Sequence, residues 1–331
     1  MAGLALLDDV ARRLGPLARR QVPLAPLCTY RVGGPAALFV TIERPEALDV
    51  VAATLAAAGG RAEPHGTAPQ DGADGDTVPV LVLGRGSNLL VADVGFPGLV
   101  VQLGDAFATV TPDRGDARLR LGGAALLPVA ARRSAAESLH GFEWAVGVPG
   151  SVGGAVRMNA GGHGSDMAAS VASVSVFDLR AGQGLTWGPA DLDFAYRRSA
   201  VAPHHVVLEA VVQLGDGRRE ESEAAIAEIV RWRRAHQPGG QNAGSVFTNP
   251  PGDSAGRMID AAGLKGLRVG TAEVSTKHAN FIQADPGGSA DDVARLITEV
   301  RRRVWDHFGV ALHCENLLVG FDAPDGEEAL R

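Results

Sequence analysis

The spacing of apolar and polar residues divides the chain into segments with helical periodicity and segments with the period of a β-strand. In residues 45–58, for example, Pro45 opens a helical pattern and Gly59 follows it, which is the usual asymmetry of helix ends. We predict helices at residues 3–14, 45–58, 124–139, 218–236, 254–262 and 290–308. We predict strands at residues 38–42, 78–83, 99–103, 117–121, 171–179, 204–214, 279–283 and 317–321, and a short apolar strand within residues 242–250.

The order of these segments indicates three consecutive units. A β-α beginning leads into a strand-rich region that closes with the strand at residues 204–214, and residues 59–77 have the composition of a loop without periodicity. The composition then changes, because residues 218–236 are rich in glutamate at the front and in arginine at the back, which suits a helix dipole. At 331 residues the chain is long enough for two or three compact units.

One stretch, residues 141–164, contains eight glycines and few charges. Glycine clusters occur where the backbone needs a positive φ or approaches something other than side chains. The backbone N–H groups near residues 150–154 can form a concavity for an anion such as a pyrophosphate, and Arg157 is the single formal charge between Trp144 and Gly161. A tight corner between a strand and a helix is the alternative.

The chain contains another glycine turn before this stretch, and we call it the first glycine turn because it comes earlier in the sequence. It is Gly84-Arg85-Gly86-Ser87-Asn88-Leu89-Leu90, and it directly follows the apolar run at residues 78–83. A strand that enters a glycine turn is typical of nucleotide sites, but the dinucleotide fingerprint needs a third glycine that opens a helix, and Leu89 occupies that position. We therefore reject a Rossmann fold. The turn can still present backbone N–H groups to a phosphate-bearing cofactor, and a plain turn between two strands is the alternative.

Composition excludes several classes of protein. The net charge of -7 argues against a dedicated nucleic-acid binder, whose footprint is basic. Cys28 and Cys314 lie far apart without ligand spacing, so we expect neither a metal site nor a disulfide framework. No apolar run approaches the ~18 residues that span a bilayer, so we expect no membrane insertion and a cytoplasmic location. Only Lys265 and Lys277 are lysines among 31 basic residues, which draws attention to both.

Seven motifs in this order and spacing resemble those of the UDP-N-acetylenolpyruvoylglucosamine reductases, over roughly residues 29–320. They are Gly84-Arg85-Gly86-Ser87-Asn88-Leu89-Leu90, Val148-Pro149-Gly150-Ser151-Val152-Gly153-Gly154, Tyr196-Arg197-Arg198-Ser199, Ala243-Gly244-Ser245-Val246-Phe247 with Asn249-Pro250, Gly263-Leu264-Lys265-Gly266, Lys277-His278-Ala279-Asn280-Phe281 and Cys314-Glu315. Each motif alone is weak, and the set of seven in register is specific.

The resemblance implies an α+β protein. A two-part FAD-binding region of the vanillyl-alcohol-oxidase-like type would comprise residues 1–92 and 93–214, and a C-terminal α+β substrate-binding domain would comprise residues 215–331. It also implies a flavoprotein that consumes NADPH to reduce the enolpyruvyl ether of a UDP-sugar to UDP-N-acetylmuramate for peptidoglycan. We expect a monomer that binds this small UDP-sugar and no nucleic acid.

The resemblance assigns the cofactor to the two glycine turns, which would hold the pyrophosphate of FAD and flank the flavin. The implied cofactor residues are Gly84, Gly86, Ser87, Asn88, Leu89, Gly147, Pro149, Gly150, Ser151, Gly153, Gly154 and Asn159.

Three residues are implied to be catalytic. Hydride addition to an alkene conjugated to a carboxylate produces an enolate, and Arg197 and Glu315 would stabilise its charge. Glu315 would serve best if it were protonated or shared a proton, so we predict a raised pKa for this carboxyl group. Ser245 would donate a proton to the enolate carbon. Without the resemblance, Ser245 is a turn hydroxyl and the arginine pair at 197–198 is a solvated surface.

The implied contacts of the UDP-sugar are Tyr196, Arg233, Asn249, Lys277 and His278. Surface charge is the alternative for Lys277. The segment between Ser199 and Gln237 is short, as in the variant of the family without an extra substrate-covering insertion, so the residue that covers the substrate cannot be carried over. The loop at 59–77 is longer than expected.

Two other functions are compatible with the sequence. One is a flavin oxidase of the same cofactor-binding fold, with the flavin attached through His163. The other is a UDP-sugar-binding regulator without turnover.

Overall fold

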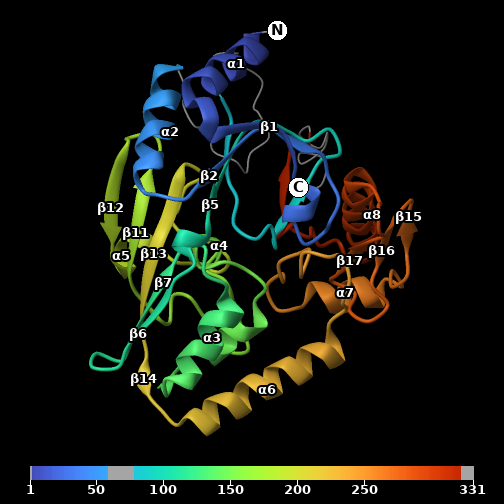
Figure 1. Cartoon of the computed structure of the whole chain (residues 1–331). Coiled ribbons are helices and arrows are strands. Elements are labelled where there is room, and N and C mark those ends of the chain that lie inside the picture. The colour runs from blue at the N-terminus through green and yellow to red at the C-terminus, as the bar shows by residue number, and fades with distance from the viewer. Residues whose placement is uncertain (1, 59–77, 322–331) are drawn as a thin grey trace.

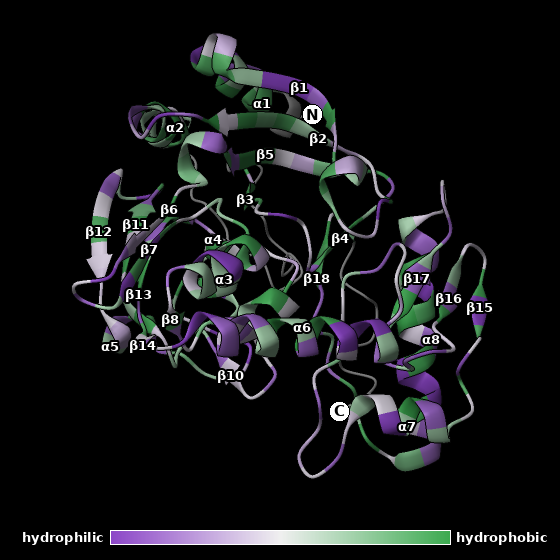
Figure 2. Cartoon of the chain, turned by 60° about the horizontal axis from the view of Figure 1, so that its bottom comes forward, coloured by the Kyte–Doolittle hydropathy of each residue, from purple (hydrophilic) through white to green (hydrophobic). Residues whose placement is uncertain are grey.

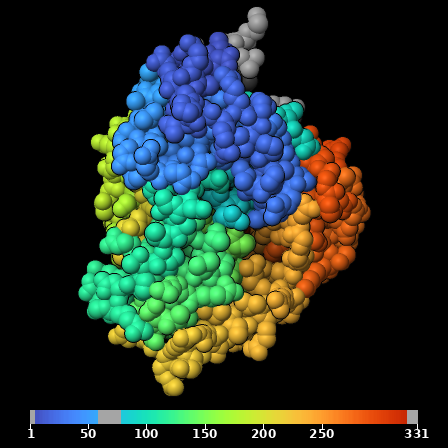
Figure 3. Space-filling view, in the orientation of Figure 1, coloured from blue at the N-terminus to red at the C-terminus, as the bar shows by residue number. Residues whose placement is uncertain are grey.

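The computed structural model describes residues 2–58 and 78–321, which form three packed units coloured blue to cyan, green to yellow and orange to red (Figures 1 and 3). The first unit is a four-stranded sheet of order β1-β2-β5-β3, in which β5 runs parallel to both β2 and β3, and β1 is antiparallel to β2. Its elements are α1 (Ala2–Leu14), η1 (Gly15–Leu17), β1 (Ala18–Pro23), η2 (Ala25–Leu27), β2 (Pro35–Ile42), α2 (Glu46–Ala57), β3 (Val80–Val82) and β5 (Phe96–Leu103).

Strand β2 is apolar on both faces because both faces of this sheet are covered. Leu38, Val40 and Ile42 pack with the apolar side of α1 and α2. Phe39, on the opposite face, packs in a second cluster with β4 (Leu89–Val91) and with Val319. The outer strand β1 is hydrophilic and β4 is hydrophobic along its length (Figure 2).

The second unit is a five-stranded antiparallel sheet of order β12-β11-β13-β7-β6. The helices α3 and α4 and the turn η4 pack on one face of it around a single apolar core. Its elements are η3 (Asp105–Phe107), β6 (Val110–Asp113), β7 (Arg118–Gly122), α3 (Leu127–Ala136), β8 (Leu139–His140), η4 (Glu143–Gly147), α4 (Val152–Arg157), β9 (Gly161–Gly162), β10 (Ser165–Asp166), β11 (Val171–Asp178), β12 (Gln183–Trp187), α5 (Pro189–Leu192), β13 (His205–Gln213) and β14 (Gly215–Asp216).

Helix α6 (Arg219–His236) runs along the bottom of the molecule from β14 to the third unit (Figure 1). Ser222 near its start donates a hydrogen bond to the buried Glu143 of η4, which fixes the helix against the second unit. No helix in residues 2–58 and 78–321 combines the length and the apolar content needed to cross a membrane.

The third unit packs two helices on a small antiparallel sheet of order β15-β16-β17. Its elements are α7 (Ala255–Ala261), β15 (Arg268–Val269), β16 (Ala272–Val274), β17 (Ile282–Ala284), α8 (Ala290–Phe308) and β18 (Leu317–Val319). Strand β18 is not part of this sheet and pairs in parallel with β4, which begins directly after Asn88 of the first glycine turn. Tyr30, Val32 and Leu90 accordingly belong to the apolar core of the third unit.

The predicted elements are found with small changes of their ends, and α8 has the predicted bounds. The helix predicted at 124–139 is shorter, Leu127–Ala136, and the strand predicted at 279–283 is β17, Ile282–Ala284. The strand predicted within 242–250 was wrong, because this segment contributes a single bridge between Phe247 and Cys314. The loop prediction at 59–77 lies outside the described residues.

Two of the predicted unit boundaries can be compared with the strand pairing. The boundary at residue 92 separates β5 from the sheet to which it is hydrogen-bonded. The boundary at 214 falls between β13 and the short β14, which pairs with β8 of the second unit. We therefore place the first boundary after β5, in the segment that contains η3.

Candidate active site

The two glycine turns, although some 65 residues apart in the sequence, touch each other. A methyl group on Gly84 would lie 2.4 Å from Ser151 Oγ, and one on Gly150 would lie 3.3 Å from Ser87 Oγ. Gly84 therefore has to lack a side chain because the second turn occupies that space. The face-to-face turns are the arrangement that a shared ligand of both would require.

Gly86 is required for a different reason. Its φ is 56°, and a methyl group there would lie 2.6 Å from Leu27 O. Thr29 N–H donates to Gly86 O at 3.1 Å, so the turn is fastened to the segment that follows η2. The segment after η2 thus fixes the backbone of the first turn.

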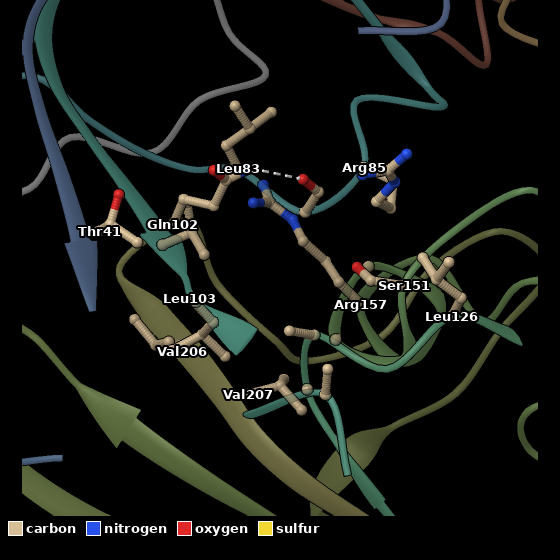
Figure 4. A pocket seen from close by; sticks show the side chains of 18 of the residues that line it. Thr41, Leu83, Arg85, Gln102, Leu103, Leu126, Ser151, Arg157, Val206 and Val207 are labelled. Carbon is tan, nitrogen blue, oxygen red and sulfur yellow. Dashed lines mark hydrogen bonds between the residues drawn. The ribbon is translucent and has the colours of Figure 1, made fainter. Parts of the chain in front are cut away.

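A cavity of about 400 Å³ opens between the first two units at these turns (Figure 4). Its size is that of a typical small-molecule site. Side chains of Thr41, Gln102, Leu126, Arg157 and Val207 line it. Of the predicted cofactor residues, Gly84, Ser151, Gly153 and Gly154 line the cavity. The others, Gly86, Ser87, Asn88, Leu89, Gly147, Pro149, Gly150 and Asn159, do not.

The cavity contains polar groups that suit an anion. Ser151 is 3% exposed, and its Oγ has no hydrogen-bond partner within the described part of the chain. Arg157 extends from α4 into the cavity, and burial lowers the pKa of its guanidinium (Figure 4). Glu43 and Asp105 also line the cavity, but no carboxylate of residues 2–58 or 78–321 forms an ion pair with Arg157. An orphaned hydroxyl, a half-buried cation and a glycine cradle fit the diphosphate of a dinucleotide cofactor.

Arg157 and Gln102 were not predicted as site residues. Arg157 carried a usable signal, since it is the single charge in an otherwise uncharged glycine stretch. Gln102 Nε2 donates to Gly84 O at 3.1 Å and so supports the first turn from β5. Nothing in the sequence pattern distinguishes Gln102, because its role depends on the pairing of β5 with β3.

The expected concavity of backbone N–H groups is only partly available. Gly150 N–H donates to Val148 O and Gly153 N–H donates to Gly123 O, each at 2.9 Å. These two donors hold the turn itself, and the prediction that they face an anion was wrong. The second turn is therefore a tight corner before α4, and some of its residues also line the cavity.

Arg197 and Glu315 form an ion pair, with 2.9 Å between Arg197 Nε and Glu315 Oε1. The side chains are 25% and 15% exposed, so the pair is largely shielded from water. Arg197 has a φ of 57° in a tight turn that Asn159 holds by donating to Ala195 O at 3.1 Å. Burial raises the pKa of Glu315, and Arg197 opposes this shift without cancelling it. The raised pKa predicted from the chemistry is confirmed in direction.

The main chain around Ser245 lies next to the main chain of Glu315. Glu315 N–H donates to Val246 O at 2.7 Å, and Phe247 bridges Cys314, so the segment of Ser245 runs beside that of Glu315. Asn88 Nδ2 donates to Glu315 O at 2.9 Å. The first glycine turn therefore extends from the cavity, at Gly84, to the ion pair, at Asn88.

Four of the five predicted substrate residues contact the end of α6 or the start of α7. Arg233 donates to Gly147 O, and Lys277 Nζ donates to Arg234 O, which ties the third unit to α6. Asn249 Oδ1 accepts the Ala255 N–H at 3.1 Å. His278 is half-buried, and its Nδ1 accepts the Asn280 N–H. Tyr196 is 63% exposed and lies beside the Arg197 guanidinium. In this structure the polar groups of Arg233, Asn249 and Lys277 are engaged by protein atoms.

His163, the residue considered for covalent flavin attachment, does not line the cavity. Its ring packs edge-on against Trp232 at 5.2 Å.

One group in the described ranges has the composition of a metal site, Asp178 with His204 and His205. The Ala202 N–H donates to His205 Nδ1 at 3.0 Å, so the proton of the neutral ring lies on Nε2. That atom faces Asp178 Oδ2 at 3.6 Å. A protonated Nε2 is not a metal ligand, so the group is best described as an Asp–His cluster.

Two family models match parts of the chain. Residues 71–186 match the family model of an FAD binding domain, and residues 236–319 match that of the UDP-N-acetylenolpyruvoylglucosamine reductase C-terminal domain. The reductase of Rubrobacter xylanophilus is 39% identical over 315 residues, which is 95% of this chain and 99% of that one. The reductase of Paramagnetospirillum magneticum is 42% identical, with 90% of each chain covered.

The crystal structure of UDP-N-acetylenolpyruvylglucosamine reductase from Thermus caldophilus is similar throughout, with a TM-score of 0.74 and 36% identity over 91% of this chain and 99% of that chain. The predicted fold class, an FAD-binding region followed by a C-terminal α+β domain, is confirmed by these matches. FAD is therefore the cofactor of this chain. The chain belongs to the family of UDP-N-acetylenolpyruvoylglucosamine reductases.

Proposed function

We propose that this protein reduces UDP-N-acetylglucosamine enolpyruvate to UDP-N-acetylmuramate, with FAD as cofactor and NADPH as cosubstrate, in the synthesis of peptidoglycan precursors. Membership of the family supports this function, and so do the two matched domains. The observation that carries it is the Arg197–Glu315 ion pair, which the Asn88 side chain joins to the first glycine turn.

Reduced FAD, when bound, supplies the hydride that adds to the terminal carbon of the enolpyruvyl double bond. Charge then develops on the substrate carboxylate, and Arg197 is the cation placed to stabilise it. A donor pre-oriented toward developing charge lowers a barrier by about 3 kcal/mol in comparable sites. The turn that Asn159 clamps holds the Arg197 backbone at its positive φ, which fixes the point from which the side chain extends.

Glu315 changes partner during this step. In the free protein Arg197 offsets the effect of burial on the Glu315 carboxyl group. When the substrate carboxylate takes over Arg197, burial and the added negative charge both favour the protonated acid. Protonated Glu315 can then donate a hydrogen bond to the enolate, whereas an ionised Glu315 would repel it.

Ser245 is the group we assign to protonate the enolate carbon. Its segment lies against that of Glu315 on the side held by Val246 and Phe247. A hydroxyl is a weak acid, but it suffices toward a carbanion-like centre when it is well placed.

The two half-reactions test this assignment under anaerobic conditions. Ser245→Ala should slow oxidation of the reduced flavin by the enolpyruvyl UDP-sugar by about 10²- to 10⁴-fold, while NADPH reduces the flavin at nearly the normal rate. Thr248→Val is the matched control, because Thr248 carries a nearby hydroxyl that donates to His313 O. Equal losses in both half-reactions would reject Ser245 as the acid, and a wild-type flavin that the UDP-sugar does not oxidise would reject the function.

Oligomeric state and location are part of the proposal. We expect a monomer, because one chain contains both glycine turns and the Arg197–Glu315 ion pair. We expect the cytoplasm as its location. Sedimentation equilibrium of the flavin-loaded protein tests the first point, and cell fractionation tests the second.

A further inference from the structure

Asn316 lies between Glu315 and β18 and is 4% exposed. Its Oδ1 accepts a hydrogen bond from Tyr30 Oη at 3.2 Å. Its Nδ2 lies 2.9 Å from Asn88 Oδ1, 3.2 Å from Ala243 O and 3.3 Å from Ser245 O. One buried amide thus contacts four residues on three segments of the chain.

Two of these three segments have to be aligned for the proposed reaction, the glycine turn that contains Asn88 and the segment that contains Ser245. Asn88 ends the first glycine turn, and its own Nδ2 donates to Glu315 O. Leu317 N–H donates to Asn88 O at 2.9 Å, so the residues on both sides of Asn316 are bonded to Asn88 as well. The link to Ser245 is made through its carbonyl oxygen, which leaves the hydroxyl group uncommitted to Asn316.

The chemistry of an amide explains why asparagine suits this position. It offers two donors and two acceptor lone pairs on a short side chain. A leucine of similar size would leave the main-chain oxygens of Ala243 and Ser245 without this donor in a buried place. An aspartate would accept from Tyr30 but would set a buried charge against three oxygen atoms.

We propose that Asn316 is a positioning residue for the reduction, which sets the placement of Ser245 and Glu315 relative to the flavin-binding turn. The proposal rests on the proposed function. Asn316 touches neither cofactor nor substrate in this scheme. It acts by holding the main chain of two groups that do, so its loss changes their placement and not their chemistry.

Replacing Asn316 by alanine in the full-length, flavin-loaded protein tests the proposal. Misplacement of reacting groups by ~1 Å costs about 10²-fold in rate, so we expect Asn316→Ala to slow the UDP-sugar half-reaction by at least about 10-fold. Flavin reduction by NADPH should stay within about 2-fold of normal, since it does not use Ser245 or Glu315. The solvent deuterium isotope effect on the UDP-sugar half-reaction should rise, because proton donation from a displaced Ser245 becomes limiting.

Thr271→Val is the matched control for loss of a part-buried hydrogen bond in the same unit. Thr271 Oγ1 donates to Asp292 Oδ2 at 2.8 Å, away from Ser245 and Glu315. We expect this variant to melt at a lower temperature with both half-reactions and the isotope effect unchanged. Asn316→Ser, which keeps a smaller donor, replaces Asn316→Ala if the latter does not fold.

The outcomes separate the inference from the function beneath it. Wild-type half-reaction rates and isotope effect in a folded Asn316 variant would overturn the positioning role alone. Equal slowing of both half-reactions would also overturn it, since that indicates a general loss of structure. If the enolpyruvyl UDP-sugar does not oxidise the reduced flavin of the wild-type protein, the proposed function itself is wrong.

Discussion

At the scale of single residues, the contact between Gly84 and Ser151 decides whether the two glycine turns can meet. Gly84→Ala introduces a methyl group at 2.4 Å from Ser151 Oγ, so one of the turns has to move. We expect the free energy of unfolding to fall by about 1–3 kcal/mol, as in other overpacked sites, and the flavin content of the purified protein to fall with it. Thermal melting and the flavin-to-protein absorbance ratio measure the two effects.

Gly184→Ala is the control for this substitution, because a methyl group on Gly184 in β12 meets nothing within 4 Å. Ser151→Ala in the Gly84→Ala background removes the opposing oxygen and should recover part of the lost stability. If the loss of unfolding free energy in the double variant is at least the sum of the losses in the two single variants, the two residues do not clash.

The pH dependence of the UDP-sugar half-reaction reports on Glu315. Burial raises the pKa of this group, and the proposed active form is protonated. The rate should therefore fall as pH rises through an apparent pKa above the ordinary 4.5 of a glutamate. Rapid mixing at a series of pH values measures this limb. In Glu315→Gln, which cannot ionise, the limb should vanish, and an unchanged profile would contradict the assignment.

Residue identities in the site could be predicted where a motif carried them, and not where the role depends on the fold. Arg197 and Glu315 lie more than 100 residues apart in the sequence and meet at 2.9 Å in the structure. Asn159 was assigned to the cofactor, yet its amide clamps the turn of Arg197. Gln102 and Asn316 belong to no motif, because what selects them is the placement of distant backbone atoms.

At the scale of secondary structure, the start of α8 is capped by two units at once. Ser289 accepts the Asp292 N–H, and Asp93, from the turn after β4, accepts the N–H groups of Ala290 and Asp291. A carboxylate is favoured at this end of the helix by the helix dipole. Asp93→Ala should lower the free energy of unfolding by about 1–2 kcal/mol, measured by denaturant titration.

Glu228→Ala, at an exposed position inside α6, is the control and should change stability by less than about 0.5 kcal/mol. If the two variants unfold at the same denaturant concentration, the Asp93 cap contributes nothing measurable.

Elements with a strong internal pattern could be predicted, and short paired ones could not. Helix α8 has the expected bounds because its apolar stripe and its capping serine are local signals. Strands β15 and β16 are only two and three residues long, so their alternation carries too little information. The parallel pairing of β18 with β4 joins segments whose sequence offers no sign of each other.

At the scale of the whole molecule, the Asp–His cluster beside the cavity makes stability depend on pH. Burial lowers the pKa of His204 to about 4, helped by His205 and Arg180, and it also lowers the pKa of His205. Between pH 6.5 and 4 the unfolded chain then binds more protons than the folded one, so stability falls as pH falls. Asp178 extends this loss of stability to lower pH, because its pKa is lowered overall. Burial raises this pKa, but the hydrogen bonds from backbone N–H groups lower it by more.

Melting temperatures measured from pH 8 to pH 4 test this expectation. The wild-type curve should be flat above about pH 7 and should fall below pH 6.5, the ordinary pKa of histidine. His204→Asn should reduce the slope in that range, and an equally steep fall would show that the acid sensitivity has another origin.

The pairing of β18 with β4 also determines when the cofactor turn is complete. A ribosome delivers Asn88 long before Glu315, which is 227 residues further on. Until then β4 has an open edge and the nascent turn lacks the bonds that Asn88 makes to the later segment. FAD can therefore be bound in its final geometry only after translation. A premature stop codon before Leu317 would yield a protein in which the first glycine turn lacks its bonds to β18.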